Sequence, residues 1–475
     1  MLIKRKFFID GQWTEPVKQN DFQVINPANE QSIAIVSMGD KHDMNRAVDA
    51  AKKAFYNYSQ TPVEERIKLL ERLLEIYKRR YNEMVQTITL ELGAPATMCA
   101  EQQAHTGIGH LQGFIDALHQ LKTRETLPNG DILCREAIGV CGLITPWNWP
   151  INQIFLKVIP ALATGCTCVL KPSEQTPLNA LLFAEMIEEA GFPAGCFNLV
   201  NGDGINAGAV LSKHKDIDMI SFTGSTTAGV SISKNAASSI KRVTLELGGK
   251  SPFIVFDDAD IEASLTQCIN TCFLNSGQSC DAPTRMLVQR SIYDKTIRMA
   301  KSVASKVSVG MPEKEGQHIG PLVSKEQFDR VQTLIEKGIK EGAHLLVGGT
   351  GKPVGYEKGY FTKATIFSDV NNQMSIAREE IFGPVLVLIP FEDEQQAIEI
   401  ANDTDYGLAA YIDTSDMVRA ERVAARLRAG MVHINGGPHR YGSPFGGYKY
   451  SGNGREGGLV GLEDFLEIKT LHYPD

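Results

Sequence analysis

Short apolar runs alternate with segments of helical length along most of this 475-residue chain. In residues 137–252 each apolar run is bounded by Gly, Pro, Asn or Ser, which is typical of buried strands joined by helices. This alternation predicts a parallel sheet with right-handed crossovers. The expected strands are 138–145, 167–171, 197–200, 219–222 and 242–246, and the expected helices are 178–190, 205–213 and 226–236.

The same alternation repeats in residues 251–447, and residues 40–125 are mostly helical and partly amphipathic. In the second block the expected strands are 253–256, 286–289, 364–366, 385–390, 409–412 and 431–434, and the expected helices are 261–275, 325–341, 394–402 and 417–429. We therefore expect an α/β fold with two Rossmann-like, parallel-sheet domains and a cleft between them. Ligands of such sheets bind beyond the carboxyl ends of the strands.

Two segments, 125–136 and 463–473, fit neither block and predict exposed strands. The second alternates as Phe-Leu-Glu-Ile-Lys-Thr-Leu. A protruding strand pair has open edges, which pairing between subunits would cover. The alternative is an edge strand that is protected by its own charges.

The charge balance argues against nucleic acid as a partner. The chain has 48 Lys and Arg against 56 Asp and Glu, a net charge of −8 and a pI near 5.8, so its surface repels phosphate backbones. Its most apolar region, 137–170, is interrupted by prolines and polar residues and offers no run of about 20 apolar residues to span a bilayer. The first residues lack the apolar core of a signal peptide, and we expect a cytoplasmic protein without a membrane partner.

Nine cysteines, an odd number scattered over a long chain, fit a reducing compartment better than a disulfide framework. Cys166 and Cys168 lie two positions apart, and Cys268 and Cys272 share a helical face. Neither pair has His or Cys partners at the spacing of zinc ligands. We expect buried structural thiols and no metal.

Two residues have the chemistry and the local setting of catalytic groups. Glu246 ends an apolar strand before two glycines, where burial raises the pKa of a carboxylate and suits it to act as a general base. The alternative is a carboxylate that caps a neighbouring backbone N–H. Cys280 lies in a polar loop, Asn-Ser-Gly-Gln-Ser-Cys, where nearby backbone N–H groups favour a reactive thiolate. The alternative is a free surface cysteine.

A third candidate is Asn148, which follows a strand in the segment Thr-Pro-Trp-Asn-Trp-Pro. An amide held between prolines and tryptophans can donate to an oxyanion. The alternative is an aromatic loop in which the asparagine satisfies its own turn.

Two further strand ends have features of a cofactor site. Lys171 and Glu174 offer one donor and one acceptor to the hydroxyls of a ligand. Residues 221–229, Ser-Phe-Thr-Gly-Ser-Thr-Thr-Ala-Gly, predict a strand, a glycine turn and a helix start whose free N–H groups suit a pyrophosphate. The segment is not Gly-x-Gly-x-x-Gly, and the alternative is that Ser225 only caps the helix.

Five separated motifs make the chain resemble the NAD(P)-dependent aldehyde dehydrogenase superfamily. They are Pro-Trp-Asn, Thr-Leu-Glu-Leu-Gly-Gly-Lys-Ser-Pro, Gly-Gln-Ser-Cys, Glu-Glu-Ile-Phe-Gly-Pro at 379–384 and Pro-Phe-Gly-Gly-Tyr-Lys at 444–449. The similarity extends from about residue 7 to residue 473. It implies an NAD-binding domain at 1–118 and 138–249, a catalytic domain at 250–449, and oligomerisation segments at 119–137 and 450–475.

The resemblance also implies roles for the catalytic candidates. Cys280 attacks the aldehyde carbon, and the Asn148 amide stabilises the oxyanion together with the backbone N–H of Cys280. Hydride then leaves for the nicotinamide, and Glu246 activates the water that hydrolyses the remaining thioester to a carboxylic acid. Lys157 and Glu456 match family positions that are implicated in proton transfer.

By the same resemblance the cofactor lies along three groups of residues. Lys171 and Glu174 are expected at the adenosine ribose, Trp147 and Ser225 near the pyrophosphate, and Glu380 and Phe382 at the nicotinamide end, with Thr145, Ser173 and Gly224 completing the site. A carboxylate at Glu174 repels a 2′-phosphate, so we predict NAD rather than NADP.

The family pattern assigns the walls of the aldehyde tunnel to Trp149, Gln153, Asp281, His439 and Phe445. This chain departs from the pattern, because Asp281 directly follows the candidate nucleophile and because Asn152 and Gln153 stand where many relatives are apolar. We therefore hypothesise that the tunnel prefers polar or amino-bearing aldehydes to long alkyl ones. The alternative is that Asp281 points away and pairs with Arg285.

Other functions of the same fold make different predictions. A CoA-acylating dehydrogenase needs no water-activating carboxylate, so Glu246 argues against it. A semialdehyde reductase would favour the reduced, phosphorylated cofactor. A non-enzymatic relative predicts a lost nucleophile or base, and both are present in this chain. The resemblance implies a homodimer or a homotetramer.

Overall fold

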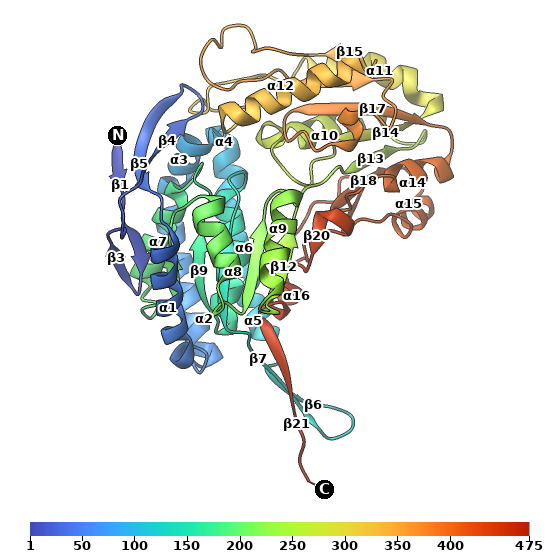
Figure 1. Ribbon diagram of the computed structural model, residues 1–475. Helices are drawn as coiled ribbons and strands as arrows, with labels where there is room; N and C mark the ends of the chain where they lie inside the picture. The colour runs from blue at the N-terminus through green and yellow to red at the C-terminus, as the bar shows by residue number, and fades with distance from the viewer. Residues whose placement is uncertain (475) are drawn as a thin grey trace.

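Two β-sheets with parallel centres organise the chain, and the computed structural model describes residues 1–474 (Figure 1). The first part of the chain supplies an eight-stranded sheet, apart from one edge strand near the C-terminal end, and the second part supplies a seven-stranded sheet. A three-stranded sheet extends from the body as an arm, and another lies beside the N-terminus. The predicted α/β fold with two parallel-sheet units and a β-strand arm is confirmed.

The eight-stranded sheet has the order β20-β12-β11-β8-β9-β10-β2-β3. Its central strands pair in parallel, whereas both edges are antiparallel. The strands are β2 (Phe7–Ile9), β3 (Gln12–Thr14), β8 (Val140–Ile144), β9 (Thr167–Lys171), β10 (Phe197–Leu199), β11 (Met219–Thr223), β12 (Arg242–Glu246) and β20 (Gly452–Asn453).

Successive residues of these strands face opposite sides, so the sheet has an apolar layer on each face. Leu143 and Leu170 pack into one layer, and Ile144 and Val169 pack into the other. The first layer contains α2 (Val63–Arg79), α3 (Tyr81–Leu92), α4 (Ala96–Met98), η1 (Cys99–Gln103), α5 (His105–Gln120), α6 (Pro150–Thr164), α7 (Leu178–Ala190) and α16 (Gly458–Glu463). The second contains α1 (Lys41–Tyr58), η2 (Gly204–Gly208), α8 (Ala209–Lys213) and α9 (Thr226–Ala237).

The seven-stranded sheet has the order β15-β16-β17-β14-β13-β18-β19, and only β15 is antiparallel to its neighbour. Its strands are β13 (Pro252–Val255), β14 (Arg285–Gln289), β15 (His344–Val347), β16 (Thr365–Ser368), β17 (Val385–Phe391), β18 (Ala409–Asp413) and β19 (Met431–Ile434). Helices α10 (Ile261–Phe273) and α11 (Arg290–Ala304) cover one face, and α12 (Lys325–Lys340), α13 (Ser375–Arg378), α14 (Glu394–Asn402) and α15 (Met417–Ala424) cover the other. The short 3₁₀ segments are η3 (Leu274–Gly277) and η4 (Lys449–Ser451).

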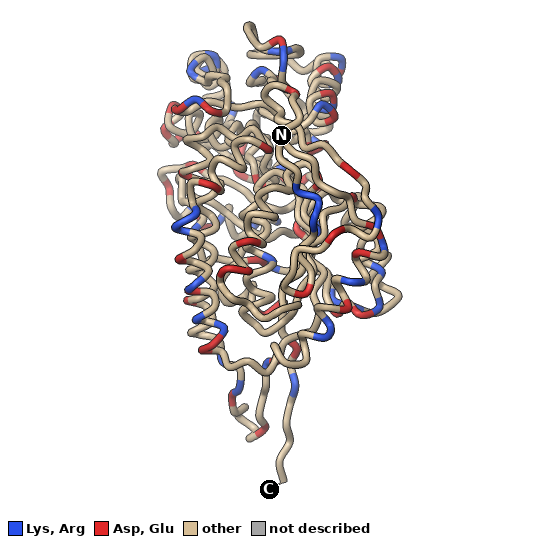
Figure 2. The backbone as a smooth tube through the Cα atoms, turned by 90° about the vertical axis from the view of Figure 1, so that its left-hand side faces the viewer, with Lys and Arg blue, Asp and Glu red and all other residues tan. Residues whose placement is uncertain are grey.

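The two segments that the sequence predicts as exposed strands form the arm. Strands β6 (Arg124–Thr126) and β7 (Ile132–Ala137) make a hairpin, and β21 (Leu466–Leu471) pairs antiparallel with the whole of β7. Figures 1 and 2 both show this sheet extending from the body with the C-terminal end at its tip. Beside the N-terminus, β1 (Leu2–Lys4), β5 (Gln31–Ser37) and β4 (Asp21–Asn26) form the remaining sheet.

None of the helices in residues 1–474 combines the length and the apolar character that a membrane span requires. Figure 2 shows Lys and Arg interspersed with Asp and Glu along the helices of the side that it presents. All nine cysteines are free thiols.

The sequence patterns did not predict two 15-residue helices, α11 and the buried α6. Pro150 stands at the first position of α6, where a missing N–H costs nothing, and Pro160 lies within the helix. Helix α6 is mostly apolar because it is buried on nearly every side, and its two prolines indicate a helix break rather than a helix. The expected helix at 205–213 is instead a π-helical turn, η2, followed by the short helix α8.

Candidate active site

Three of the candidate residues meet at the ends of different elements. Asn148 lies in the turn between β8 and α6, and Glu246 is the last residue of β12. Cys280 lies in the loop that leads from η3 to β14 of the second sheet. The site therefore lies between the two sheets, beyond the carboxyl ends of the first sheet's parallel strands and next to the loop that enters β14.

The loop before Cys280 has an unusual backbone. Asn275, Ser276 and Gly277 are all left-handed, with φ of 53°, 58° and 74°. A Cβ atom at Gly277 would lie 2.2 Å from the carbonyl of Gly383, so only glycine permits this close approach. The Ser276 hydroxyl donates to the Gly320 carbonyl at 2.9 Å. All three residues are buried, so the surrounding structure stabilises this unusual backbone. Such strained backbone is common at functional sites.

The Cys280 thiol is partly exposed, whereas every other cysteine except Cys134 is buried. Burial raises the pKa of the Cys280 thiol well above its usual value, and the nearby carboxylates of Asp281, Glu380 and Glu246 raise it further. A Cβ atom at Gly249 would lie 2.2 Å from the Cys280 carbonyl, so the two loops are in direct contact. This setting disfavours the thiolate form of Cys280.

Asn148 is buried, and its hydrogen bonds join it to the cysteine loop rather than to its own turn. The side-chain amide donates to the Gln278 carbonyl at 3.0 Å. The neighbouring Trp149 indole donates to the Ser279 hydroxyl at 2.8 Å. The Pro-Trp-Asn-Trp turn is thus attached to the residues directly before Cys280, and the alternative of a self-satisfied turn is wrong.

Glu246 is buried, and neither of its carboxylate oxygens has a hydrogen-bond partner among the described residues. The alternative, a carboxylate that caps a backbone N–H, is therefore wrong. Burial raises the pKa of Glu246 well above its ordinary value and the Glu456 carboxylate adds to the rise, while Lys157 and Arg455 oppose it. A Cβ atom at Gly446 would lie 2.6 Å from Oε1, so the side chain packs on backbone that only glycine leaves open.

Lys157 and Glu456 form a buried ion pair beside Glu246. The Lys157 ammonium donates to the Glu456 carboxylate and, at 2.7 Å, to the Thr223 hydroxyl. Burial raises the pKa of Glu456, and the Lys157 charge lowers it. The strand register brings these groups together, because Thr223 of β11 is paired with Glu246 of β12.

At the end of β9 the predicted adenosine-ribose residues lie together. The buried Lys171 ammonium donates to the carbonyls of Pro172 and Gly202 at 2.7 and 2.9 Å and lies 3.7 Å from the half-exposed Glu174 carboxylate. Burial lowers the pKa of Lys171, whereas Glu174 raises it. The Ser173 hydroxyl accepts from the Gln175 N–H at 3.2 Å.

Gly224 and Ser225 lie where β11 turns into α9. The Ser225 hydroxyl accepts from the Ala228 N–H at 3.3 Å, so Ser225 does cap this helix. The Gly224 N–H donates to the Glu246 carbonyl at 3.1 Å, which joins the helix start to the end of β12. Thr145, one strand away, is buried and donates its N–H to the Lys171 carbonyl at 3.2 Å.

Glu380 and Phe382 reach the same region from the second sheet. The Gly249 N–H donates to Glu380 Oε1 at 2.9 Å, and a Cβ atom at Gly248 would lie 2.4 Å from Oε2. Burial raises the pKa of Glu380 to about 7, although the Gly249 hydrogen bond opposes the rise. Phe382, left-handed at φ 60°, meets the edge of the Trp147 ring at a centroid distance of 5.3 Å.

The sequence model of the aldehyde dehydrogenase family matches residues 13–471 of the chain. The chain belongs to this family. Oxidation of an aldehyde to its acid, the activity predicted from the sequence, is thereby confirmed.

Three relatives show how close the match is. A crystal structure of aldehyde dehydrogenase from Bartonella henselae is 53% identical, with 100% of both chains covered and a TM-score of 0.98. The 3-succinoylsemialdehyde-pyridine dehydrogenase of a Pseudomonas species is 49% identical over 98% of each chain. A cysteine-to-alanine mutant of aldehyde dehydrogenase C from Pseudomonas syringae, solved with NAD+ and octanal, is 46% identical, with 98% of this chain and 96% of that chain covered and a TM-score of 0.97.

In this aldehyde dehydrogenase, polar groups gather next to Cys280. Burial raises the pKa of the Asp281 carboxyl above its ordinary value, while a backbone hydrogen bond and the charges of His433 and His439 oppose the rise. The His439 ring meets the edge of Phe445 at 5.9 Å between centroids. His433 stacks on Tyr411 at 4.6 Å, and its Nε2 atom is buried with no hydrogen-bond partner in residues 1–474.

The alternative pairing of Asp281 with Arg285 is wrong. Arg285 is fully buried, and its guanidinium donates to the carbonyls of Lys250, Ile400 and Ala401 and to the Asn372 side chain, each at 2.9 Å. These acceptors hold the guanidinium in the interior of the second domain. The Asp281 carboxylate is therefore left beside the histidines.

The other side of the site comes from α5 and α6. His110 Nε2 lies 2.7 Å from Asn152 Oδ1, and burial lowers the pKa of His110 to about 4, so the neutral ring donates to the amide oxygen. Tyr441 meets the His110 ring edge-on at 5.0 Å. Gln153 is buried, and its Oε1 atom has no partner among the described residues. Sequence reasoning missed His110, His433 and Tyr441, because nothing in their local sequence separates them from surface or core positions.

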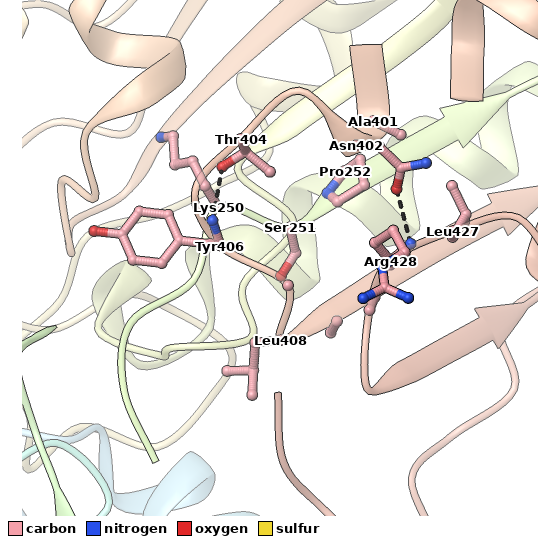
Figure 3. A pocket seen from close by; sticks show the side chains of 14 residues that line it. Lys250, Ser251, Pro252, Ala401, Asn402, Thr404, Tyr406, Leu408, Leu427 and Arg428 are labelled. Atoms are coloured by element: carbon pink, nitrogen blue, oxygen red, sulfur yellow. Dashed lines mark hydrogen bonds between the residues drawn. The ribbon is translucent and has the colours of Figure 1, made fainter. Parts of the chain in front are cut away.

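The lysine of the Gly-Gly-Lys-Ser-Pro motif, Lys250, is buried and lines a separate small cavity. Figure 3 shows the Lys250 side chain directed away from Arg428, on the far side of a cavity of about 10 Å³. Burial, and the Arg285 charge to a lesser extent, lower the pKa of Lys250 to about 7. Lys250 is among the largest fully buried side chains of the protein, so the motif's lysine belongs to the packed interior.

Proposed function

We propose that this aldehyde dehydrogenase uses NAD and that Cys280 forms the covalent intermediate. The proposal is supported chiefly by the convergence of Cys280, Asn148 and Glu246 from three distant stretches of the chain. Each group has the chemistry that its step requires: a partly exposed thiol, a fixed amide donor and an unpartnered carboxylate.

The reaction begins when the Cys280 sulfur bonds to the aldehyde carbon and the thiol proton passes to solvent. The aldehyde oxygen becomes an oxyanion, to which the Asn148 amide and the Cys280 backbone N–H donate. NAD, when bound, accepts the hydride from that carbon. Glu246 then takes a proton from a water whose oxygen attacks the thioester carbon, the carbon–sulfur bond breaks, and the acid leaves. Lys157 and Glu456 carry the proton away from Glu246.

The residues around the cofactor position suit NAD. Lys171 and Glu174 offer a donor and an acceptor to ribose hydroxyls, and the free N–H groups at the start of α9 suit a pyrophosphate. Glu380 and Phe382 complete the site at the nicotinamide end, with Thr145, Trp147, Ser173, Gly224 and Ser225 between.

The direct test of the activity is a screen of aldehydes with NAD, in which reduced nicotinamide is followed by absorbance. We expect turnover to the acid without any thiol co-substrate. A requirement for coenzyme A would identify an acylating enzyme instead, which Glu246 argues against.

We predict that the KM for NADP exceeds that for NAD by at least about tenfold, because the Glu174 carboxylate repels a 2′-phosphate. In the Glu174→Gln variant this ratio is expected to shrink, while the exposed control Glu71→Gln leaves it unchanged. Steady-state kinetics with both cofactors measures the ratio. A preference of the wild-type enzyme for NADP contradicts the prediction and would favour a reductase.

We also propose that polar or amino-bearing aldehydes are the preferred substrates. One relative is named for a pyridine semialdehyde and another was solved with octanal, so the relatives do not point to one class of aldehyde. The proposal therefore depends on the residues of this chain. Trp149, His439 and Phe445 supply aromatic surface, while the free amide oxygen of Gln153 and the Asp281 carboxylate accept hydrogen bonds.

A comparison of kcat/KM for aminoaldehydes and fatty aldehydes tests this substrate proposal. We expect the aminoaldehydes to be favoured, and Gln153→Leu to reduce that preference by roughly tenfold because a hydrogen-bond acceptor is lost. The exposed Gln112→Leu serves as control. A strong preference of the wild-type enzyme for long alkyl chains contradicts the proposal.

The arm supports an oligomer, a homodimer or a homotetramer. Strands β6 and β21 are the open edges of its sheet, and β21 exposes Ile468 at 66% of its surface. We propose an NAD-binding domain at 1–118 and 138–249 and a catalytic domain at 250–449. Segments 119–137 and 450–475 are proposed to act in oligomerisation. Within the last segment, β20 and α16 lie against the first sheet. Nine free thiols favour the cytoplasm.

A further inference from the structure

A fully buried glutamine, Gln103, reaches the site from a distant element. It is the last residue of the π-helical turn η1, and its Nε2 atom donates to the backbone carbonyl of Asn148 at 2.9 Å. Forty-five positions separate the two residues in the sequence. Nothing in the cofactor or substrate assignments above involves this side chain.

The Asn148 carbonyl accepts a second amide. The left-handed Asn275 donates its Nδ2 to the same oxygen at 2.8 Å and also, at 3.2 Å, to the Gln278 carbonyl. Because the Asn148 amide itself donates to the Gln278 carbonyl, both ends of this residue are fixed. Gln103 holds it from the α-helical layer of the first sheet, and the cysteine loop holds it from the other side.

The π-helical turn decides where Gln103 points. Its defining bond runs from the Ala104 N–H to the Cys99 carbonyl at 2.9 Å, five residues back. The turn is supported by the Tyr77 hydroxyl, which donates to the Ala104 carbonyl at 2.7 Å. One extra residue in a turn rotates the following side chains by about 100° relative to a regular helix. Such turns occur often at functional sites.

The Gln103 side chain makes one hydrogen bond within residues 1–474, the donation to Asn148. Its Oε1 atom is buried and has no partner among the described residues, although buried amide oxygens are usually paired. An apolar residue of similar size would pack there without this cost. The donation to Asn148 is therefore the interaction that accounts for a glutamine at this position.

We propose that Gln103 is a positioning residue for the oxyanion-binding amide of Asn148. By holding the carbonyl, it fixes the orientation of the residue, so that the amide hydrogen not used by Gln278 faces the aldehyde oxygen. The inference rests on the proposed role of Asn148. Small errors in the placement of such a donor reduce the rate by up to about 100-fold, because the oxyanion is stabilised only at the right distance and angle.

The experiment compares Gln103→Leu, which removes the donor, with Gln103→Glu, which replaces it by a carboxyl group of the same shape. The control is Gln112→Leu, the same exchange at an exposed position on α5. Single-turnover formation of reduced nicotinamide reports the steps that need the oxyanion site. Alkylation of Cys280 by iodoacetamide and binding of NAD report the integrity of the thiol and cofactor sites.

We expect Gln103→Leu to slow single-turnover formation of reduced nicotinamide about 10- to 100-fold, with alkylation and NAD binding within about twofold of wild type. The activity of Gln103→Glu relative to wild type is expected to fall as pH rises. A buried carboxyl has a raised pKa, donates to the Asn148 carbonyl while it is protonated, and repels that oxygen once ionised. This pH dependence is not expected from a role in stability alone. It therefore still tests the positioning role of Gln103 if Gln103→Leu fails to fold.

Unchanged single-turnover rates in Gln103→Leu would overturn the inference. So would equal losses in turnover, alkylation and NAD binding, which indicate a structural role, or a Gln103→Glu profile parallel to that of wild type. If the wild-type enzyme itself fails to reduce NAD with any aldehyde, the proposed function fails instead, and the two failures are thereby distinguished.

Discussion

Replacing Cys280 by alanine is expected to abolish aldehyde-dependent reduction of NAD, with a loss on the order of 10⁴-fold or more. Without the sulfur no covalent adduct forms, and the oxyanion site has nothing to stabilise. Binding of NAD should remain, because the predicted cofactor contacts belong to other residues. Steady-state turnover and a fluorescence titration with NAD measure the two effects.

The matched control is Cys134→Ala, since Cys134 is the other cysteine that is not fully buried and it lies in the arm. We expect it to retain wild-type turnover. Because burial and three carboxylates raise the pKa of Cys280, iodoacetamide should alkylate the unliganded enzyme faster as pH increases through the neutral range. Substantial turnover in Cys280→Ala would remove the basis of the proposed mechanism.

Replacing Glu246 by glutamine is expected to leave one fast turnover per subunit and then stop the enzyme. The amide cannot take a proton from water, so hydrolysis of the thioester should slow by roughly 10² to 10⁴-fold, whereas formation of reduced nicotinamide needs no such base. A stopped-flow burst equal to the number of active sites measures the first effect. Mass spectrometry of the quenched protein should show an acyl group on Cys280.

The control for this variant is Glu262→Gln, an exposed glutamate at the start of α10. The pH dependence gives a second check. Since burial and Glu456 raise the pKa of Glu246, its base form is lost as pH falls through that raised pKa, so deacylation in wild type should weaken at a higher pH than an exposed carboxylate would allow. A variant that turns over without a burst contradicts the assignment of Glu246 as the base.

Much of the fold follows from local sequence patterns. The expected strands 167–171 and 242–246 and the helix 178–190 coincide with β9, β12 and α7. Period-two and helical patterns mark these elements because each buries its apolar residues against a neighbouring layer. Helix α6 was not predicted, because prolines and polar residues interrupt its apolar stretch and mask the helical pattern.

The residues of the candidate site also differ in whether the sequence predicts them. Short motifs around Cys280, Glu246 and Asn148 identify those residues, because the loops that carry them have distinctive composition. The partners of these residues have no such signal. Sequence position alone allows Arg285 to pair with Asp281, yet the Arg285 guanidinium donates to the carbonyls of Lys250, Ile400 and Ala401. Only the packing of the chain shows which acceptors it meets.

The amino-acid sequence by itself determined the α/β architecture, the family and the three groups whose chemistry suits aldehyde oxidation. The tertiary structure alone decided that Glu246 has no hydrogen-bond partner in the part of the chain that the structure describes, and that Gln103 holds the Asn148 carbonyl. Local patterns report which face of a strand or helix is buried. A hydrogen bond between a side chain and a backbone carbonyl 45 residues away depends on the distance and angle that packing alone creates.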